Sequence, residues 1–533
     1  MTANALPPAR RHQHWTLSKS ARHSQNGVVV AASAPAAEIG ARILAEGGNA
    51  VDAAVGVGCA LHVTEPWSSG LGGGGFMLVY LAASKAVHAI NFSMKAAMDV
   101  RADDYPLVPG GRRTGPFQWP QVVDDRHSFG WGSILIPGAV DGFGLALEQF
   151  GTWRWDQVLD PVIGLAEAGV PVGWYTTLAI ASEARGLAAF PGTRDVFLRG
   201  GAYPPTVEGD DGADVLRYPE LTRFLKRLAK EGPRDFYEGA IARDIVADMA
   251  AGGRNWTLDD LKAYRARLRE PITQDYRGHT LIAAPDLNGG PTVLRFFEHY
   301  EAAHHPTPGR PGPADYAALA GQLRARWEER YSTMGDTGAA DRCTTHFNVV
   351  DRHGNMVSLT NTLGARFGSK VTLGRLGLLM NDGMFWFDPE PGKPNSIGPG
   401  KWPLTNACPL MIARGGRVWY ASGASGGRRV PPMMIQLASF LIDHGLGLEE
   451  AFHVPRIDPV RLEAVSCDHR MAPEQVAAVA AVAPVRVTEN ATYPMVFAVP
   501  CAVVCDPATG TNSGMASIDV PYSVALAEED VAG

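Results

Sequence analysis

Two adjacent threonines in mid-chain, within Cys343-Thr344-Thr345-His346, constrain this sequence more than any other feature. Downstream of them the side chains alternate, with Phe347 and Val349 on the same face of an extended segment. Residues 352–355 then have turn composition and lead to a second apolar segment, 356–360. The pattern predicts a strand, a tight turn and a returning strand. One interpretation is an ordinary β-hairpin, in which the two threonines are present only because threonine is favoured in β-strands.

Thr344 also supports a chemical interpretation. If the Cys343–Thr344 bond is cut, Thr344 gains a free α-amine beside its own hydroxyl, which places a nucleophile and a base for acyl transfer on one residue. An α-amine titrates at about pH 7.7–8.0 in model compounds, so it can take the hydroxyl proton near neutral pH. The preceding segment, 334–343, has no periodicity. That composition suits a linker whose end moves away after cleavage.

Composition narrows the class of protein. The 533-residue chain is 46% hydrophobic and 19% charged, which is typical of a globular protein with a large core. A net charge of −7 without a basic stripe gives no reason to expect a nucleic-acid partner. Six cysteines in so long a chain make no disulfide framework, and Cys501 and Cys505 lack the second pair that a zinc site needs. We therefore expect no metal and no cofactor.

The N-terminus and the hydropathy of the chain bear on location. The first residues are basic but no apolar segment follows them, and the sequence lacks the run of about eighteen apolar residues that a spanning helix needs. We expect no secretion signal, no membrane segment and a cytoplasmic protein.

Six segments, in order and over most of the chain, resemble landmarks of the γ-glutamyltranspeptidase family. They are AEIGARILAEGGNAVDAAV (37–55), EPWSSGLGGGGFM (65–77), IPGAVDGFGLALEQFG (136–151), TTHFNVVD (344–351), KWPLTNACP (401–409) and SGASGGRR (422–429). The glycine-rich pieces alone would be a weak signal, but the set is specific.

The resemblance implies an α/β fold, the four-layer α-β-β-α sandwich of N-terminal-nucleophile hydrolases. The residue pattern alone supports only a mixed α/β protein. The resemblance also implies a polar N-terminal arm (1–26), a large chain (27–343) and a small chain (344–533), with both chains forming one sandwich. Whether two such heterodimers associate stays open.

Local patterns predict the individual elements. Helical spacing over 37–63 is broken at Gly47-Gly48-Asn49, and strands are expected at 77–80 and 87–92. Residues 140–270 are expected to be mainly helical, with stops at Gly151, Gly169 and Gly232 and a helix start capped by Thr257. Strands dominate after 344, with one clear helix at 431–444 and an Ala/Val-rich stretch at 473–482.

The resemblance assigns catalytic roles to four residues. Thr344 is the nucleophile, and Thr362 matches a threonine that hydrogen-bonds the nucleophile. Gly426 and Gly427 match the pair whose N–H groups stabilise the oxyanion, which needs close backbone approach without a Cβ. An alternative interpretation of Gly426 and Gly427 is a tight turn before the helix expected at 431. Thr345 and His346 are expected to support the site. We do not assign His346 as a base, because a lone histidine in a strand is more often a packed residue.

The substrate-binding positions depart from the family pattern. Ser93 stands where the family has the arginine that clamps the glutamyl carboxylate, Gly364 where it has an asparagine, and Phe385 and Trp386 where it has acidic residues for the α-amine. Thr405 and Asn406 replace a Ser-Ser pair but can still donate hydrogen bonds. A free glutamyl head group would leave charges unpaired in such a pocket. Asp382 or Asp388 could restore amine binding if the loop were shifted.

These observations predict an autoprocessing threonine hydrolase acting on a small-molecule, non-glutamyl acyl or carbonyl substrate. The resemblance includes branches that release a small acid such as an oxalyl group, or cleave a C–C bond in actinobacterial antibiotic biosynthesis. Lys95, Arg366, Lys370, Arg428 and Arg429 are candidates for replacing the carboxylate clamp. Two alternatives stay open: a γ-glutamyl hydrolase or transferase with a rearranged pocket, and an unprocessed pseudoenzyme scaffold.

Overall fold

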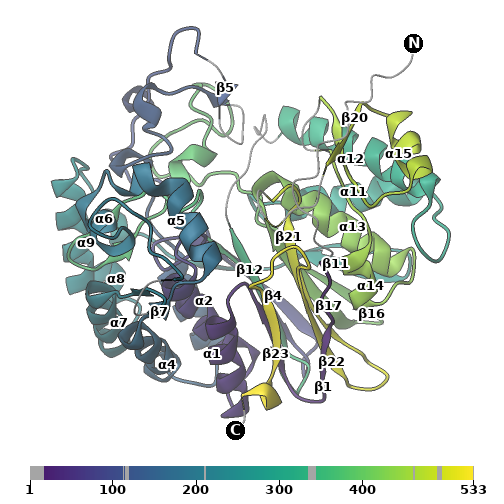
Figure 1. The fold of residues 1–533 in the computed structure, drawn as a ribbon, viewed down its shortest axis with the longest axis horizontal. Coiled ribbons are helices and arrows are strands. Elements are labelled where there is room, and N and C mark those ends of the chain that lie inside the picture. The colour runs from purple at the N-terminus through teal and green to yellow at the C-terminus, as the bar shows by residue number, and fades with distance from the viewer. Residues whose placement is uncertain are drawn as a thin grey trace.

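Two stacked β-sheets form the centre of the molecule, with helices on both outer faces (Figure 1). The structure is a computed structural model that describes residues 17–111, 113–114, 119–208, 212–333, 344–459, 463–488, 492 and 495–531. The order of layers is α-β-β-α, so the four-layer sandwich predicted from the sequence is confirmed. Among the described helices, none combines the length and apolar character needed to cross a membrane.

The first sheet, called here the β12 sheet, carries the two threonines at one strand end. Its seven strands lie in the order β23 (Val524–Ala527), β2 (Val28–Ala31), β12 (Thr345–Val350), β13 (Met356–Thr362), β3 (Gly74–Leu81), β4 (Ala86–Phe92) and β9 (Arg267–Arg269). The predicted strand-turn-strand is confirmed as β12 and β13, which pair antiparallel with Val349 opposite Val357. Gly354 supplies the positive φ of +81° in the turn between them.

The second sheet, called here the β17 sheet, packs against the first. Its seven strands lie in the order β1 (Arg22–Ser24), β22 (Asn512–Ala516), β21 (Val499–Cys505), β17 (Arg417–Ser425), β16 (Leu410–Arg414), β11 (His279–Ala283) and β10 (Ile272–Tyr276). In both sheets, strands that precede Thr344 in the chain are hydrogen-bonded to strands that follow it. The described part of the polar arm, 17–26, lies on the body, and β1 extends the β17 sheet at its edge.

One helical layer covers the outer face of the β12 sheet. It comprises α1 (Ala34–Ala45), α2 (Ala50–Thr64), α3 (Ala139–Phe150), α4 (Trp155–Ala168), α5 (Trp174–Leu187), α6 (Pro191–Phe197), α7 (Pro219–Glu231), α8 (Asp235–Glu238), α9 (Ala240–Ala251) and α10 (Leu258–Lys262). The predicted stops at Gly151, Gly169 and Gly232 are confirmed as the C-caps of α3, α4 and α7. Thr257 caps α10 in a capping box with Asp260, as predicted.

The other helical layer covers the β17 sheet. It comprises α11 (Gly290–Ala303), α12 (Pro313–Thr333), α13 (Val430–Ile442), α14 (Leu448–His453) and α15 (Pro473–Ala480). The predicted helix at 431–444 is α13, and the Ala/Val-rich stretch is α15. The long helix α12 has no counterpart among the predicted elements.

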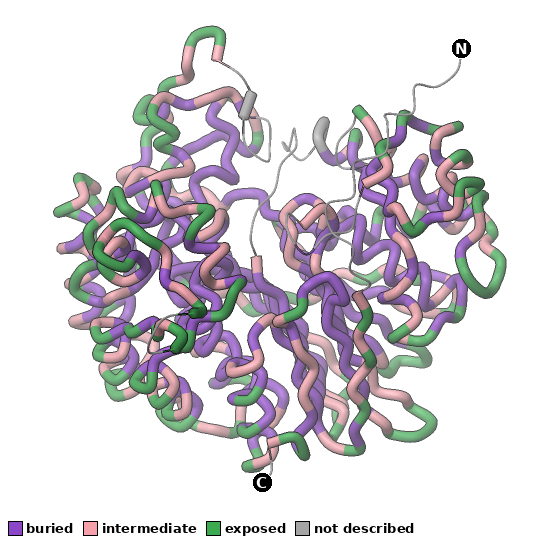
Figure 2. The backbone as a smooth tube through the Cα atoms, in the orientation of Figure 1, coloured by how far each residue is buried: buried purple, intermediate pink, exposed green. Residues whose placement is uncertain are grey.

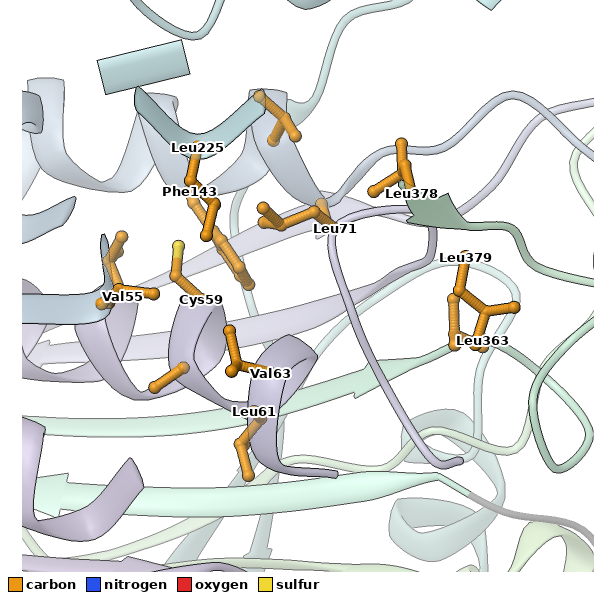
Figure 3. Packing of buried hydrophobic residues seen from close by; sticks show 14 of the residues in the cluster. Val55, Cys59, Leu61, Val63, Leu71, Phe143, Leu225, Leu363, Leu378 and Leu379 are labelled. Carbon is orange, nitrogen blue, oxygen red and sulfur yellow. The ribbon is translucent and has the colours of Figure 1, made fainter. Parts of the chain in front are cut away.

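Three apolar cores fill the three spaces between the four layers. The first lies between the helices and the β12 sheet, and Figure 3 shows Val55, Cys59 and Val63 of α2 in it with Phe143 of α3. The second lies between the β17 sheet and α11–α15. The third lies between the two sheets, and the buried backbone of both sheets runs through the middle of Figure 2. Strand β12 is therefore buried on both faces, as its unbroken burial shows.

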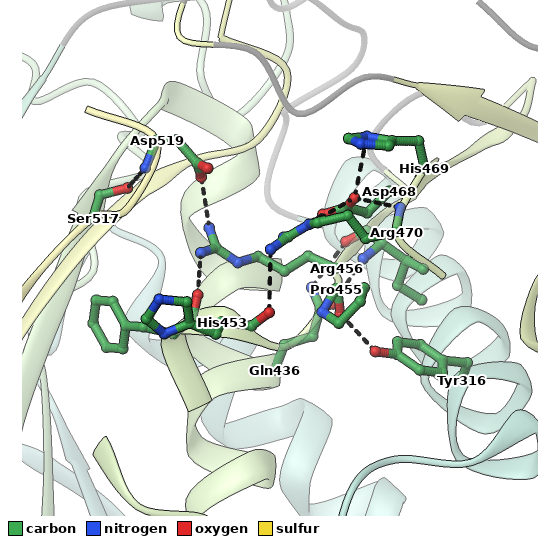
Figure 4. A network of polar contacts seen from close by, with 12 residues as sticks. Tyr316, Gln436, His453, Pro455, Arg456, Asp468, His469, Arg470, Ser517 and Asp519 are labelled. Atoms are coloured by element: carbon green, nitrogen blue, oxygen red, sulfur yellow. Dashed lines mark hydrogen bonds and ion pairs between the residues drawn. The ribbon is translucent and has the colours of Figure 1, made fainter. Parts of the chain in front are cut away.

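A buried polar network joins α12 to the C-terminal part of the chain (Figure 4). The guanidinium of Arg456 is fully buried, lies 3.4 Å from a carboxylate oxygen of Asp519 and donates to the carbonyl of Phe452 at 2.9 Å. The Tyr316 hydroxyl on α12 donates to the Pro455 carbonyl at 2.6 Å. Burial lowers the pKa of Arg456. Because a buried cation is costly without partners, this network fixes α12 against the segment that follows α14.

Candidate active site

Thr344 lies at the head of strand β12, next to the end of β13. Its hydroxyl donates to the hydroxyl of Thr362, with 3.3 Å between the two oxygens. The Thr362 hydroxyl also accepts the N–H of Gly364 at 2.9 Å, which fixes its orientation. The antiparallel register brings these ends together, since Thr345 pairs with Asn361. Cys343, the other half of the predicted cleavage site, lies outside the described residues.

One cavity collects most of the residues singled out in the sequence. It lies beside Thr344, and we call it the first cavity. Its lining consists of Gly74, Gly75, Phe76, Ser93, Thr344, Thr362, Gly364, Phe385, Trp386, Thr405, Asn406, Ala407, Gly427, Arg428 and Val430. The structure thus brings together ten of the positions named from the sequence, which come from six separate segments.

Gly426 and Gly427 form the corner between β17 and α13. Their φ angles are +137° and +60°, a region that favours glycine, and a Cβ on Gly426 would lie 2.9 Å from the Cα of Ala498. Among the turn and loop hydrogen bonds of the described residues, none has the N–H of Gly426 or of Gly427 as its donor to a backbone carbonyl. The pair precedes the N-terminus of the 13-residue helix α13, where backbone N–H groups and the helix dipole favour negative charge. The turn interpretation and the anion-binding interpretation are thus compatible.

Thr345 points to the opposite face of β12 from Thr344. Its hydroxyl donates to a carboxylate oxygen of Glu65 at 2.5 Å, at the C-terminal end of α2. Glu65 is only 5% exposed, and burial raises the pKa of its carboxyl to about 7, against the lowering effect of the Thr345 hydrogen bond and the Arg366 charge. Thr345 therefore anchors the head of β12 to the helical layer.

His346 is a packed residue. Its Nδ1 lies 2.8 Å from the Thr360 hydroxyl and its Nε2 lies 3.2 Å from Oδ1 of Asn348. Burial lowers its pKa to about 3, so the ring is neutral at physiological pH. A Cβ on Gly423 of the neighbouring sheet would lie 2.2 Å from a carbon of this ring. The ring thus fills the space between the sheets and does not line the first cavity.

Three polar side chains line the first cavity beside Thr344. The Ser93 hydroxyl is buried and has no hydrogen-bond partner among the described residues. Thr405 and Asn406 are held by the buried guanidinium of Arg330, which donates to the Thr405 carbonyl at 3.0 Å and to the Asn406 Oδ1 at 3.1 Å. Arg330 was not singled out from the sequence, because its place under the cavity depends on the unpredicted helix α12.

The aromatic wall of the first cavity is formed by Phe385 and Trp386, whose ring centroids are 5.4 Å apart. Gly364 has a φ of +102°, and a Cβ there would lie 2.0 Å from a carboxylate oxygen of Asp382. Asp382 accepts the Ala365 N–H at 2.8 Å, and Asp388 pairs with Lys393 at 2.8 Å. Both aspartates are buried outside the cavity lining.

The five candidate cations do not gather in one place. Arg428 lines the first cavity, where burial lowers the pKa of its guanidinium to about 9 against the opposing charge of Asp458. Arg366, Lys370 and Arg429 line a second, larger cavity on the other side of Thr344. The Lys95 ammonium lies 6.0 Å from the centre of the Trp402 ring and is in neither lining.

Comparison with known proteins places this geometry in a family. The family model described as gamma-glutamyltranspeptidase matches residues 36–342 and 325–509. The chain belongs to the γ-glutamyltranspeptidase family. It is therefore an enzyme of the autoprocessing N-terminal-nucleophile hydrolase class, and the resemblance read from the six sequence landmarks is confirmed.

An acylase and a glutathione hydrolase match this chain about equally well. An acylase ACY 1 proenzyme of Pseudomonas sp. (strain V22) is 33% identical over 494 residues, covering 85% of this chain and 86% of the relative. A glutathione hydrolase proenzyme of Escherichia coli (strain K12) is 31% identical over 495 residues, covering 81% of each. The crystal structure of a cephalosporin acylase from Bacillus halodurans superposes with a TM-score of 0.83 at 22% identity, covering 97% of this chain and 99% of that one, which shows the shared fold.

Proposed function

We propose that this protein is an autoprocessing threonine hydrolase that cleaves a small acidic, non-glutamyl acyl group from its substrate. The observation that carries the proposal is the lining of the first cavity. Among the described residues, this lining contains one charged group, Arg428, and no carboxylate. A γ-glutamyl head group brings an α-ammonium that would be buried there without a counter-charge, at a cost of several kcal/mol.

Maturation would cut the chain between Cys343 and Thr344. The Thr344 hydroxyl attacks the Cys343 carbonyl, the peptide nitrogen leaves as the free α-amine, and water hydrolyses the resulting ester to give the Cys343 carboxylate. The products are chains of 343 and 190 residues. They would stay associated, because strands from both are hydrogen-bonded within each sheet.

Turnover would use the same hydroxyl. The α-amine of Thr344 takes the hydroxyl proton while the oxygen attacks the acyl carbonyl, and the Thr362 hydroxyl at 3.3 Å keeps the nucleophile oriented. The N–H groups of Gly426 and Gly427 stabilise the oxyanion. The ammonium then returns the proton to the leaving nitrogen, and water hydrolyses the acyl ester in the second half of the reaction.

The remaining lining describes the acyl group. Arg428 supplies a positive charge, the Ser93 hydroxyl is a buried group with no described partner, and Asn406 presents its Oδ1 to Arg330, which leaves its NH₂ for a substrate oxygen. Phe385 and Trp386 give a flat apolar wall. An oxalyl-like group, planar and with one carboxylate, fits this combination of charge, donors and aromatic surface.

A second candidate, a γ-glutamyl hydrolase or transferase, is favoured by the similarity to glutathione hydrolase proenzymes. It requires Asp382 or Asp388 as the amine ligand, and both are engaged outside the first cavity. The test compares oxalyl-, acetyl- and γ-glutamyl-p-nitroanilide as substrates. We expect turnover of the oxalyl compound, weaker turnover of the acetyl compound and none of the γ-glutamyl compound. Rapid γ-glutamyl turnover would refute the proposal.

Two variants make that test specific. Arg428→Met should lower kcat/KM for oxalyl-p-nitroanilide far more than for the uncharged acetyl compound. Ser93→Arg alone should not create γ-glutamyl activity, because Gly364, Phe385 and Trp386 still leave the α-amine without a partner. Denaturing electrophoresis of the purified protein addresses the pseudoenzyme alternative directly, since a scaffold would stay a single 533-residue chain.

A further inference from the structure

The loop that follows β13 takes an unusual backbone path beside the two threonines of the site. It runs from Leu363 to Lys370, and we call it the β13 loop. Two of its non-glycine residues, Phe367 and Lys370, have φ angles of +55° and +67°, in the left-handed region that such residues rarely adopt. Both residues are buried. A conformation of this kind persists only where the surroundings hold it, and such segments gather at functional sites.

The ammonium group of Lys370 is enclosed by the loop that carries it. It donates to the carbonyl of Arg366 and to that of Gly368, the latter at 3.4 Å. Its third partner is a carboxylate oxygen of Glu183 on α5, at 3.2 Å. These three acceptors match the three N–H donors of an ammonium group. The donors of Lys370 are thus directed at oxygens of the protein itself and not at a substrate carboxylate.

Two helices fix the remainder of Lys370. A Cβ on Gly186 of α5 would lie 3.4 Å from the Cγ of Lys370 and 3.5 Å from its Cε, so the aliphatic stem lies along that helix. The Lys370 carbonyl accepts the hydroxyl of Thr193 on α6 at 2.7 Å. The same Thr193 hydroxyl accepts the N–H of Thr372 at 2.9 Å. Lys370 therefore joins the β13 loop to the helical layer that covers the β12 sheet.

The start of the β13 loop lies against the threonine pair. The Gly364 N–H donates to the Thr362 hydroxyl at 2.9 Å, and the same hydroxyl accepts from that of Thr344 at 3.3 Å. One residue separates Gly364 from Arg366, whose carbonyl receives the Lys370 ammonium. A shift of the Arg366 carbonyl would thus be passed through a single residue to the N–H that orients Thr362.

We propose that Lys370 is a positioning residue for the nucleophile. Its ammonium holds the β13 loop in its left-handed turns, and through Gly364 the loop orients the Thr362 hydroxyl that contacts Thr344. The proposal rests on the proposed function, in which Thr344 is the nucleophile and Thr362 orients it. Because the two threonine hydroxyls are already in contact in the uncut chain, Lys370 influences maturation as well as turnover.

The test measures maturation, which needs no added substrate. The unmodified protein and its variants are made by cell-free translation, and cutting of the 533-residue chain is followed over days by denaturing electrophoresis. We expect Lys370→Met to slow cleavage about tenfold or more, because methionine keeps much of the length but has no donor. Glu183→Gln removes the carboxylate and leaves both carbonyl contacts, so it should slow cleavage less.

Lys85→Met is the matched control. Lys85 also has a left-handed φ, of +58°, but it is exposed in the turn between β3 and β4. Its replacement should leave the rate of cleavage unchanged. Urea denaturation of Lys370→Met in the Thr344→Ala background, which should remain one chain, checks that the variant folds. If it does not fold, Glu183→Gln takes its place in the comparison that follows.

The Thr362→Val background separates positioning from a general loss of structure. If Lys370 acts through the Thr362 hydroxyl, Lys370→Met slows cleavage of the otherwise unmodified chain but adds little once that hydroxyl is gone. An equal slowing in both backgrounds would overturn the proposal. Unchanged cleavage of the Lys370→Met chain would overturn it as well.

The outcomes also distinguish this proposal from the function on which it rests. If the unmodified chain is not cut, the threonine hydrolase function fails and the role of Lys370 fails with it. If the unmodified chain and Thr362→Val are cut at the same rate, the orienting role of Thr362 is wrong, and so is the proposal. If Thr362→Val is slow and Lys370→Met is not, the proposed function stands and the role of Lys370 alone is refuted.

Discussion

The Glu65 carboxyl provides a quantitative test of how tightly the head of β12 is buried. Burial raises its pKa from 4.5 to about 7 in the folded protein. Between these two pH values the unfolded chain has released the proton and the folded chain retains it, so stability falls as the pH rises. The stabilising contribution is fully present below pH 4.5 and is lost as the pH passes about 7. The difference between the two pKa values corresponds to about 3 kcal/mol.

The substitution that isolates this effect is Glu65→Gln. The amide does not titrate, and its oxygen can still accept the Thr345 hydroxyl, which is 2.5 Å from the carboxylate in the native protein. We would make the change in the Thr344→Ala background, which we expect to remain one chain, and measure urea denaturation at pH 4.5 and pH 8. When the pH is raised from 4.5 to 8, the free energy of unfolding of the variant should increase by about 3 kcal/mol relative to that of its parent.

The exposed residue Glu46 supplies the control. Glu46→Gln removes one carboxylate from the surface at the end of α1 and should change stability by less than about 0.5 kcal/mol at either pH. If Glu65→Gln differs from its parent by the same amount at pH 4.5 and pH 8, Glu65 is not held in its neutral form. Burial of the Glu65 carboxyl beside Thr345 would then not account for the pH dependence of stability.

Three further changes test the site and its support. Thr344→Ala should run as a single 533-residue chain on denaturing electrophoresis, and cleavage at 343/344 in this variant would exclude autocatalysis. Thr362→Val removes the hydroxyl 3.3 Å from that of Thr344 and should lower kcat about 100-fold with little change in KM, measured on the native substrate class. Gly423→Ala places a Cβ 2.2 Å from the His346 ring and should lower the free energy of unfolding by more than about 3 kcal/mol in urea denaturation. The control Gly164→Ala adds a Cβ into open space on α4 and should leave that free energy unchanged or slightly raised.

The sequence predicted those secondary-structure elements whose boundaries depend on residues close together in the chain. The stops at Gly151 and Gly169, the Thr257 cap and the β12–β13 pair depend on residues a few positions apart, and the structure has all of them. Helix α12 was not predicted because its apolar residues pack mainly against α11 and α15, which lie elsewhere in the sequence. No feature within residues 313–333 indicates that α11 and α15 would cover them.

The site was predicted as a set of residues but not as an arrangement. The family resemblance named the positions that converge on the first cavity. It did not separate the neighbours Arg428 and Arg429, which follow the Gly426-Gly427 corner and line different cavities. Glu65 was visible in the EPWSSG motif as a lone carboxylate ending an apolar helix. Such a residue signals a buried anchor only when its partner is known, and here that partner, Thr345, lies 280 positions away.

The interleaved strand order has a consequence for biosynthesis. Strand β2 pairs with β12 on one side and β23 on the other, and β3 pairs with β13, so a ribosome that has delivered only residues before Thr344 has made strands whose neighbours do not yet exist. Their unpaired edges would invite association with other chains until the C-terminal third arrives. We expect the fragments 1–343 and 344–533, expressed separately, to aggregate, whereas the uncut precursor assembles both sheets in one event. The peptide bond before Thr344 would then serve as a tether needed during folding, and its loss afterwards would leave a product that cannot readily refold.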